Sequence, residues 1–592
     1  MGVMEREPVI GQSNIPDSRG TNFYYSDPGF GSLLRVYLGQ CAFEALEPKL
    51  IELGRRAADE LDVLAATADK NPPTLRHRTR RGEDIQSIDK HTAYVELERI
   101  AYSELGLASM SHRGEAIAPL VKYALTFLFV QAEFGLCCPV SMTDSLTRTL
   151  RKFGSAALVE RFLPNLISQD FDTLFQGAMF MTEQAAGSDV AGISTQAKRV
   201  GDEWRLTGNK WFCSNPDANL AMVLAHVDGA AAGMKGLGLF LLPKTLSNGN
   251  PNYYRIVRLK DKLGSRSMAS GEIILDGAHA YLIGEVGRGF HQMADMINMS
   301  RLSNGVRAAG LMRRAVNEAL HVARNREAFG RKLVDLPLMQ RQLVKMMLPT
   351  EQARSMFMQI AINLPRADAG DEDAKKLVRI LTPLIKFRAC RDARRVTGDA
   401  MEVRGGVGYI EEWSDPRLVR DAHLGSIWEG TSNIVALDIA RAVKREGALG
   451  PLREYLLRLL DEARLPSRSH ALFASLLERA CSAMLRVAGA ADSADGADTQ
   501  RDELVREAGT SLYHACTAIF MASEAARQAP DFRRLGLAHL IARYKLLPRA
   551  PLEIGEQDED VAQEILALIV AEAPLSLDDA LRLLPKQAEQ AS

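Results

Sequence analysis

The feature that most constrains the fold is the order in which hydrophobic periodicities follow one another along the chain. Apolar residues recur at helical spacing from about residue 30 to 175, strand-like runs occupy about 175 to 285, and helical spacing then returns. This order lacks the βαβ alternation that builds a parallel dinucleotide-binding sheet. The sequence therefore predicts a multidomain α+β fold. Its expected parts are an N-terminal helical domain (1–175), a middle antiparallel β domain (176–285), a C-terminal helical domain (286–445) and an additional C-terminal helical domain (446–592).

Local patterns predict individual elements within these parts. Helical spacing indicates helices over 50–64 and 120–131, and the polar, basic stretch 69–89 between them is interpreted as a loop. In the β domain, Thr207-Gly208-Asn209 predicts a turn between two strands. The glycines of 284–289 lack the context of a dinucleotide motif and are interpreted as turn residues. Further helices are expected over 452–460, 471–488 and 504–526, with an exposed linker over 489–499.

Charge and cysteine content exclude several classes of protein. The net charge of −1 over 592 residues gives no whole-protein attraction for nucleic acid or anionic membranes. Seven scattered cysteines, odd in number, indicate reduced thiols, and no Cys/His cluster has zinc spacing. Residues 1–19 lack a secretory pattern, and the longest apolar stretch, 123–130, is too short to cross a bilayer. We therefore expect a cytoplasmic protein with no metal and no membrane partner.

One short turn near the end of the segment 286–445 carries a candidate base. Glu429 lies between bulky Trp428 and Gly430, just before a helix start signalled by Thr431 and Ser432. A carboxylate held on such a turn is partly desolvated, and desolvation raises the affinity of a carboxylate for protons. The simpler role of an acidic residue here is to offset the helix macrodipole. Neighbouring motifs decide between these two roles.

Four further segments occur in a fixed order along the chain. They are 179–190 (MFMTEQAAGSDV), 210–215 (KWFCSN), 325–330 (NREAFG) and 402–409 (EVRGGVGY), and the Glu429 turn follows them. Each segment alone has a simpler interpretation as a turn, as strand packing or as a surface ion pair. Together, from about residue 90 to 445, the ordered set strongly resembles the acyl-CoA dehydrogenase family.

The resemblance implies that residues 286–445 form a C-terminal four-helix bundle and that FAD binds between the three family domains. The hydroxyls of Thr182 and Ser188 suit the polar edge of a flavin, and Gly187 permits close backbone approach. Phe212 and Ser214 would supply an aromatic wall and a hydroxyl over the ring. Phe212 departs from the tryptophan that is more common in the family, so an indole donor is lost at this position.

The resemblance also implies cofactor contacts across a subunit interface. Arg326 matches an arginine that reaches the pyrophosphate of a neighbouring subunit's FAD, a role for which a guanidinium is well suited. Gly405 and Gly406 match a glycine pair that admits the same dinucleotide. Pro337 stands near the position where most relatives carry a glutamine contact to FAD, and proline has no donor. The full implied cofactor set is Met181, Thr182, Gly187, Ser188, Phe212, Ser214, Arg326, Glu402, Gly405, Gly406, Thr431 and Asn433.

The reaction implied by the resemblance is α,β-desaturation of an acyl-CoA thioester. Glu429 would take the α-proton while the β-hydrogen leaves as hydride to flavin N5, which yields a trans-2-enoyl-CoA. Some relatives take their base from a glutamate just before the arginine of the helix that opens the C-terminal domain. Ser300 occupies that position here, so Glu429 is the only matching base. The implied contacts to acyl-CoA are Ser188, Arg301 and Gly430.

Within the family, the chain most resembles the AidB branch, the alkylation-response flavoproteins. The resemblance lies in the long C-terminal extension and in 260–267 (KDKLGSRS), 337–339 (PLM) and 426–430 (SIWEG). Members of that branch are tetramers linked to DNA protection through a basic C-terminal domain. Residues 443–592 of this chain instead hold 18 Lys and Arg against 23 Asp and Glu. The local basic cluster is therefore interpreted as a solvated helix face; it comprises Arg533, Arg534, Arg543, Lys545 and Arg549.

These observations favour a homotetrameric acyl-CoA dehydrogenase of fatty acid metabolism, with electron-transfer flavoprotein as the electron acceptor. The first alternative is an AidB-type flavoprotein that binds DNA and has little catalytic role. The second is an acyl-CoA oxidase, which the C-terminal residues 589–592 disfavour because they are not a peroxisomal tripeptide.

Overall fold

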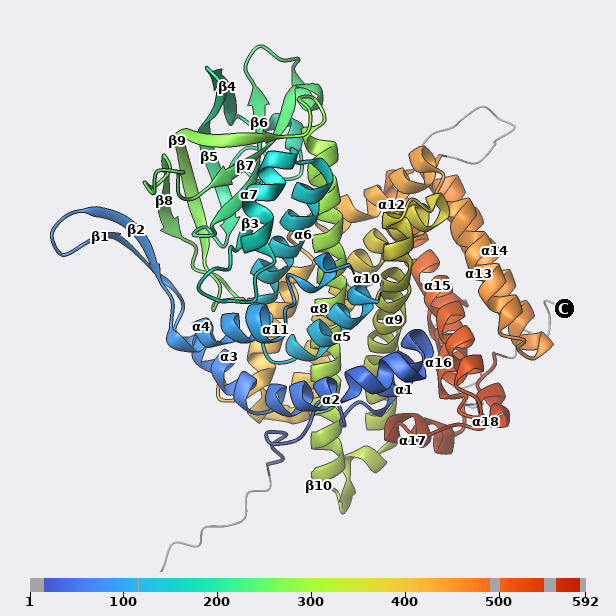
Figure 1. The fold of residues 1–592 in the computed structure, drawn as a ribbon. Coiled ribbons are helices and arrows are strands. Elements are labelled where there is room, and N and C mark those ends of the chain that lie inside the picture. Colours follow the sequence, from blue (N-terminus) through green and yellow to red (C-terminus); the bar gives the residue numbers. More distant parts are fainter. Residues whose placement is uncertain (1–14, 115–116, 490–500, 548–560, 586–592) are drawn as a thin grey trace, which may run out of the picture.

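The computed structural model describes residues 15–114, 117–489, 501–547 and 561–585. Helices and one hairpin come first, a β domain follows, and long helices complete the chain (Figure 1). This arrangement confirms the predicted fold class. The N-terminal elements are α1 Pro28–Leu38, α2 Gln40–Ala57, α3 Glu60–Lys70, β1 Thr74–Arg78, β2 Asp84–Asp89, α4 Thr92–Arg99, α5 Ala118–Phe129, α6 Cys137–Phe153 and α7 Ala156–Leu166.

Two predictions in the N-terminal part are wrong in detail. The helix expected over 50–64 is interrupted, because Asp59 has φ −138° and ψ −88° between α2 and α3. The loop expected over 69–89 contains a projecting antiparallel hairpin, β1–β2, in which Thr74 pairs with Asp89 (Figure 1). Gly82, with φ +88°, supplies the left-handed residue of its turn. The arginines of this stretch therefore lie on a regular hairpin that stands away from the body.

The β domain forms one seven-stranded sheet. Its strands are β3 Gly177–Phe180, β4 Gln196–Val200, β5 Glu203–Ser214, β6 Leu220–Val227, β7 Leu237–Pro243, β8 Tyr254–Leu259 and β9 Ser270–Ile283. The strand order is β3-β6-β4-β5-β9-β7, with β8 paired to β9 and β6 also paired to β7. Most pairs are antiparallel, but β6 pairs in parallel with both β3 and β4. The sheet is thus mixed, which corrects the expectation of a purely antiparallel domain.

The turn predicted at Thr207-Gly208-Asn209 does not occur. These residues lie inside the continuous strand β5, where the pairing with β9 shifts register between Leu206 and Thr207. A Cβ on Gly208 would lie 2.7 Å from the Cα of Thr195. The glycine therefore marks a bulge and a close backbone approach rather than a chain reversal.

Long helices form the bundle and its extension. The bundle elements are α8 Gly289–Asn325, β10 Glu327–Ala328, β11 Arg331–Lys332, α9 Pro337–Asp368, α10 Glu372–Arg404, α11 Ser414–Gly425 and α12 Ser432–Glu446. The extension adds α13 Leu449–Glu462, α14 Ser467–Ala488, α15 Val505–Arg527, α16 Arg533–Ile541, α17 Gln563–Ala571 and α18 Leu577–Arg582. Gly284 and Gly287 have positive φ just before α8, so their prediction as turn residues is confirmed. The linker expected over 489–499 lies almost entirely outside the described residues.

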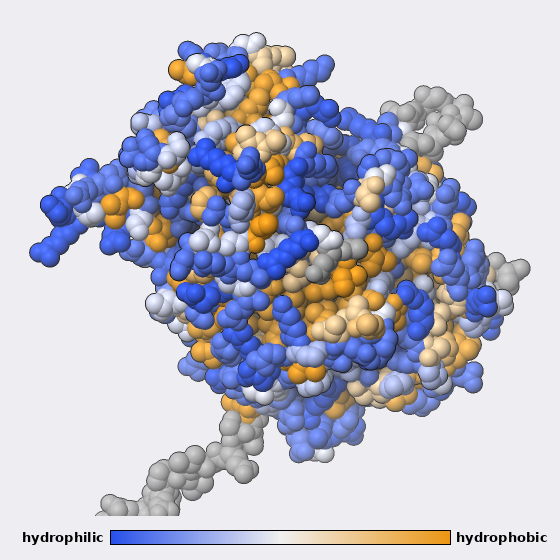
Figure 2. Space-filling view, viewed as in Figure 1, coloured by the Kyte–Doolittle hydropathy of each residue, from blue (hydrophilic) through white to orange (hydrophobic). Residues whose placement is uncertain are grey.

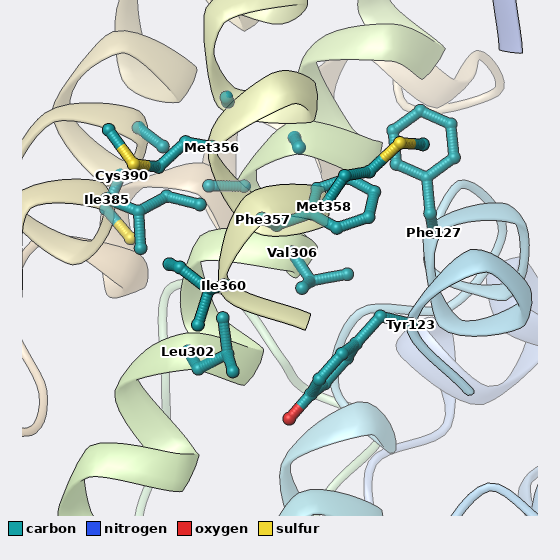
Figure 3. Packing of buried hydrophobic residues seen from close by; sticks show 14 of the residues in the cluster. Tyr123, Phe127, Leu302, Val306, Met356, Phe357, Met358, Ile360, Ile385 and Cys390 are labelled. Carbon is teal, nitrogen blue, oxygen red and sulfur yellow. The ribbon is translucent and has the colours of Figure 1, made fainter. Parts of the chain in front are cut away.

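The hydrophobic core is continuous from the N-terminal helices through the bundle. Leu302 and Val306 of α8 face Tyr123 and Phe127 of α5, with Phe357 of α9 between them (Figure 3). All five side chains are almost completely buried. The outer surface shown in Figure 2 is mainly hydrophilic. No helix in the described part of the chain is both long and apolar enough to cross a membrane.

Buried ion pairs fasten the extension to the bundle. Arg534 of α16 donates to Glu524 at 2.6 Å and to Glu351 of α9 at 2.7 Å. Arg354 of α9 pairs with Glu351 and with Asp27 near the N-terminus, in the latter case at 2.7 Å. The interpretation of the basic cluster as a solvated helix face is therefore wrong for its described arginines. Arg533, Arg534 and Arg543 are all buried, and Arg549 lies outside the described residues.

Candidate active site

The Glu429 turn has an uncommon backbone conformation. Glu429 itself has φ +55° and Gly430 has φ +103°, and α12 begins two residues later with Thr431 as its N-cap residue. A non-glycine residue in the left-handed region is uncommon and marks a position held by its surroundings. The predicted helix start is confirmed, although the Thr431 side chain makes no capping hydrogen bond. The turn directs the half-buried Glu429 side chain toward α8.

Two neutral donors on α8 hold the Glu429 carboxylate. Ser300 Oγ donates to Oε1 at 2.5 Å and Asn304 Nδ2 donates to Oε2 at 2.5 Å. Residues four apart lie on one face of a helix, so α8 presents both donors side by side. No cation of the described residues forms a salt bridge with this carboxylate. Glu429 is therefore oriented by two hydrogen bonds from neutral donors.

Arg301 supports the turn from the same helix. Its Nε donates to the carbonyl oxygen of Glu429 at 3.1 Å, and its Nη1 pairs with Asp438 at 2.7 Å. A Cβ at Gly430 would lie 3.3 Å from Arg301 Nη2, so a side chain there would crowd the guanidinium. The structure thus brings Glu429, Gly430 and Arg301 together. Arg301, implied as a contact to acyl-CoA, is already engaged with Asp438.

A second group of predicted residues lies in the β domain. The amide of Trp211 donates to the carbonyl of Thr182 at 2.9 Å, which joins the segment after β3 to β5. Phe212, on the same strand, leaves 59% of its surface exposed. Met181 and Ser214 are half-buried, and Gly187 and Ser188 are exposed on the loop that follows Thr182. This face presents an aromatic side chain and several hydroxyls to the outside.

A buried ion pair fixes that loop. Lys210 Nζ lies 2.7 Å from Glu183 Oε1, and the hydroxyls of Ser194 and Thr195 also donate to the carboxylate. Burial opposes ionisation, but Lys210 and Thr195 outweigh it and lower the pKa of Glu183 to about 2. The loop that carries Thr182 and Ser188 is therefore anchored at both ends.

A third group lies at the far end of α8. Arg326 Nη1 donates to the carbonyl of Arg404 at 3.1 Å and would lie 3.7 Å from a Cβ on Gly405. Gly405 has φ +77° and its amide donates to the carbonyl of Glu402, which ends α10. From Ser300 to Asn325, α8 rises by about 38 Å at about 1.5 Å per residue. The Glu429 group and the Arg326 group of one chain are therefore too far apart to contact the same small ring system.

Two residues of the site are absent from the sequence-based prediction. The sequence excludes Ser300 as a base and does not single out Asn304, yet both hold Glu429. Their four-residue spacing on a largely apolar helix is the available signal. Asn433, predicted to contact the cofactor, accepts a hydrogen bond from Arg506 of α15 at 3.3 Å. Within the described ranges, no cluster of His, Cys, Asp and Glu is arranged to hold a metal ion.

Comparison with known proteins places this geometry in a family. Residues 178–278 and 287–444 match the middle and C-terminal domains of acyl-CoA dehydrogenase, and residues 14–173 match the N-terminal domain of the adaptive response protein AidB. Acyl-CoA dehydrogenase family member 11 of Caenorhabditis elegans is 34% identical over 436 residues, which are 71% of this chain and 70% of that protein. The chain belongs to the acyl-CoA dehydrogenase family. Its predicted resemblance to that family is confirmed.

Other relatives refine the placement within the acyl-CoA dehydrogenase family. The AidB protein of Escherichia coli (strain K12) is 33% identical over 411 residues, which are 67% of this chain and 73% of that protein. The crystal structure of Caenorhabditis elegans ACDH-11 in complex with C11-CoA superposes with a TM-score of 0.83 at 26% identity, over 100% of this chain and 97% of that one. The apo form of Bd2924 superposes with a TM-score of 0.78 at 30% identity, over 87% and 100% of the two chains. The extended architecture, C-terminal helices included, is therefore shared.

Proposed function

We propose that this acyl-CoA dehydrogenase family member uses FAD to desaturate an acyl-CoA thioester between its α and β carbons, with Glu429 as the base. The observation that carries the proposal is the Glu429 carboxylate, held at a left-handed turn by Ser300 and Asn304 without a cationic partner among the described residues. A carboxylate oriented by neutral donors is placed to remove a proton. The complex of the structurally similar ACDH-11 with C11-CoA supports an acyl-CoA substrate.

In this mechanism the protein orients the substrate, excludes water and receives one proton. Glu429 takes the α-proton at a carboxylate oxygen, while Ser300 and Asn304, which each donate to one of its two oxygens, hold the carboxylate in place. Arg301 fixes the turn through the Glu429 carbonyl, which keeps the base from rotating away. Bound FAD would supply the acceptor for the hydride that leaves the β-carbon. The product is a trans-2-enoyl-CoA, and preorganised geometry is the main contribution of the chain.

The residues present suit FAD if two subunits share each site. Exposed Phe212 and the hydroxyls near Thr182 offer a ring wall and polar contacts on one chain. Arg326 beside Gly405 offers a phosphate site on another, because no carboxylate of the described residues neutralises this guanidinium and the glycine leaves room for a backbone approach.

Apolar surface beside that phosphate site supports a homotetramer. Phe329 is 92% exposed, Leu338 and Tyr409 are each 80% exposed, and all three lie close in sequence to Arg326, Pro337 or Gly405. Large apolar side chains that are exposed next to these residues in sequence indicate an association surface. A homo-oligomer with closed symmetry would cover them and bring Arg326 to a neighbour's cofactor.

Replacing Arg326 by alanine is expected to weaken FAD retention by roughly 10-fold or more, because a charge-assisted phosphate contact contributes about 1.5–3 kcal/mol. The chain should still fold, since the Arg326 side chain makes only one hydrogen bond within the described part of the molecule. The measurement is FAD affinity by flavin fluorescence, with oligomeric state by light scattering. Arg199→Ala, at an exposed arginine of the β domain, is the matched control. Unchanged FAD affinity in the Arg326 variant would remove this residue from the cofactor site.

The electron acceptor we infer is electron-transfer flavoprotein, as the family resemblance implies. Reduced protein should pass electrons to that acceptor faster than to oxygen, and rapid peroxide formation in air would favour the oxidase alternative instead.

The AidB-type alternative predicts duplex DNA binding that falls steeply with salt. Burial of Arg533 and Arg534 in ion pairs removes them as a DNA surface.

A further inference from the structure

One buried cation near Glu429 has no use in the mechanism above. Arg307 lies on α8 three residues after Asn304 and is completely buried. Its Nε donates to the carbonyl of Ser303 at 3.3 Å, but neither terminal nitrogen has a hydrogen-bond partner among the described residues. No carboxylate of the described residues forms a salt bridge with it. Burying an uncompensated charge costs several kcal/mol, so this arrangement calls for a ligand.

Other arginines on the same helix show the contrast. Arg313 and Arg314 are also almost completely buried, and each is matched to acids. Arg313 pairs with Glu572 at 2.7 Å, and Arg314 pairs with Glu318 at 2.7 Å and Asp62 at 3.1 Å. The fold therefore neutralises buried guanidinium groups elsewhere on α8. Arg307 is left unneutralised on the face that holds Glu429.

Aromatic rings lie next to Arg307. Its guanidinium lies 4.8 Å from the ring centre of Trp428 and 5.5 Å from that of Phe134. Burial raises the pKa of the Cys138 thiol to about 11 in spite of Arg307, so the thiol is neutral at physiological pH. Burial lowers the pKa of Lys386, and Arg307 adds to that effect whereas Glu429 opposes it. Arg307 and Glu429 thus act on the same two side chains, and Arg307 lies near the base without a salt bridge to it.

A small cavity lies between the helices α5, α6 and α8, and Ser303 and Cys137 form part of its wall. Neither Arg307 nor Glu429 lines it. Ser303 is the residue whose carbonyl accepts from Arg307, and Cys137 is close enough for Arg307 to affect its pKa. Ser303 also precedes Asn304, which holds Glu429. Ser303 thus borders the cavity, Arg307 and the residue that holds the base.

The cavity wall itself is polar, but its own charges are satisfied. Lys122 lies 2.9 Å from Asp144, and His112 lies 3.1 Å from the same carboxylate. Although burial opposes ionisation, Lys122 and His112 lower the pKa of Asp144 to about 2. Tyr123, which faces Leu302 and Val306 in Figure 3, also lines the cavity. Unlike these charged groups, Arg307 has terminal nitrogens with no hydrogen-bond partner among the described residues.

We propose that Arg307 is a specificity-determining residue that binds a carboxylate at the far end of the acyl chain. The substrate class would be a mono-CoA thioester of a dicarboxylic acid, whose acyl chain passes Glu429 and ends at Arg307. A carboxylate is the anion that a planar guanidinium binds through two parallel hydrogen bonds. A methyl-ended chain of the same length would leave Arg307 buried and unpaired. This inference rests on the proposed acyl-CoA dehydrogenase function.

The test compares matched pairs of thioesters on the FAD-loaded protein. Adipoyl-CoA is compared with hexanoyl-CoA, and suberoyl-CoA with octanoyl-CoA, by calorimetric binding to the Glu429→Gln variant and by flavin reduction in the wild-type protein. We expect the carboxylate-ended member of at least one pair to bind more tightly. Adding Arg307→Met should weaken its binding by roughly 10- to 100-fold, the equivalent of one or two charge-assisted hydrogen bonds. Binding of the methyl-ended partner should stay the same or improve.

Three further variants complete the design. Arg307→Lys keeps the charge and should recover part of the affinity for the carboxylate-ended thioester, and Arg324→Met, an arginine variant on the same helix, should change neither ligand. Equal loss of both thioesters in Arg307→Met and in Arg307→Gln would show a structural role and overturn the inference. A wild-type preference for every methyl-ended partner, with normal flavin reduction, would overturn it while leaving the proposed function intact. Flavin reduction by neither class would instead reject the proposed function.

Discussion

Replacing Glu429 by glutamine is expected to slow reduction of the bound flavin by acyl-CoA by roughly 100- to 10,000-fold, the usual contribution of a positioned base. The amide has nearly the same size as the carboxylate but cannot accept the α-proton. Its oxygen still accepts from Ser300 or Asn304, so the turn should persist. FAD content and thermal stability should remain close to those of the wild-type protein. Anaerobic stopped-flow absorbance of the oxidised flavin measures the effect.

Two further variants separate the role of Glu429 from the roles of its neighbouring residues. Glu412→Gln changes an exposed glutamate of the same domain, and the flavin bound to this variant should be reduced as fast as that of the wild-type protein. Ser300→Ala removes one hydrogen bond of about 1 kcal/mol and should slow reduction by only about 5-fold. A Glu429→Gln protein that is reduced at the wild-type rate would show that another group removes the α-proton.

Replacing Arg354 by leucine is expected to destabilise the protein by about 3–5 kcal/mol, because it leaves buried acids without their counterion. Arg354 is completely buried and pairs with both Asp27 and Glu351. It therefore links the start of the chain to α9, and Glu351 in turn links α9 to Arg534 of the extension. The midpoint of urea unfolding measures the loss. Arg366→Leu, on the exposed side of α9, should cost at most about 1 kcal/mol.

The same ion-pair network predicts an acid-sensitive stability. Burial alone would raise the pKa of Glu351, but Arg354 and Arg534 outweigh burial and lower it well below its ordinary value. A group with a lowered folded-state pKa stabilises above its unfolded pKa, and that stabilisation is lost as the pH falls through about 4.3 and below. Wild-type stability should therefore decline on acidification below about pH 5. The decline should be shallower in Arg354→Leu, and an identical slope would contradict this account of the network.

The sequence predicts the order of elements well because hydrophobic periodicity is a local property. Helices expected over 120–131, 471–488 and 504–526 overlap α5, α14 and α15 closely. The order of helical and strand-like segments likewise predicts the fold class, because it depends on the type of each element and not on exact boundaries. The Glu429 turn can also be predicted from the sequence, since a short polar break before a helix has a compositional signature.

What the sequence does not reveal depends on partners distant in the chain. Thr207-Gly208-Asn209 has turn composition, yet pairing with β9 and the close approach of Thr195 keep it inside a strand. Arg533 and Arg534 look like a solvated basic face until Glu351, 183 residues from Arg534 in sequence, is placed beside them. Propensity and charge count cannot identify such partners, because tertiary contacts override local preference.

In the candidate site, too, the sequence predicts some residues and only the structure reveals others. Motif order points to Glu429, whereas Ser300 and Asn304 are recognisable only once α8 is seen beside the turn. Arg307 is not predictable either, because a buried arginine becomes informative only when its terminal nitrogens are seen to lack hydrogen-bond partners among the described residues. Sequence therefore indicates the chemistry, and the structure indicates which groups position it.

The central claim is tested most directly by single-turnover reduction of the FAD-loaded protein with a panel of acyl-CoA thioesters under anaerobic conditions. Loss of oxidised-flavin absorbance and formation of enoyl-CoA, identified by mass spectrometry, would be followed in the same sample. The account predicts that at least one thioester reduces the flavin and yields one trans-2-enoyl-CoA per flavin. If no thioester of any length or end group reduces the flavin, the dehydrogenase account is contradicted and a binding role of the AidB type becomes the better explanation.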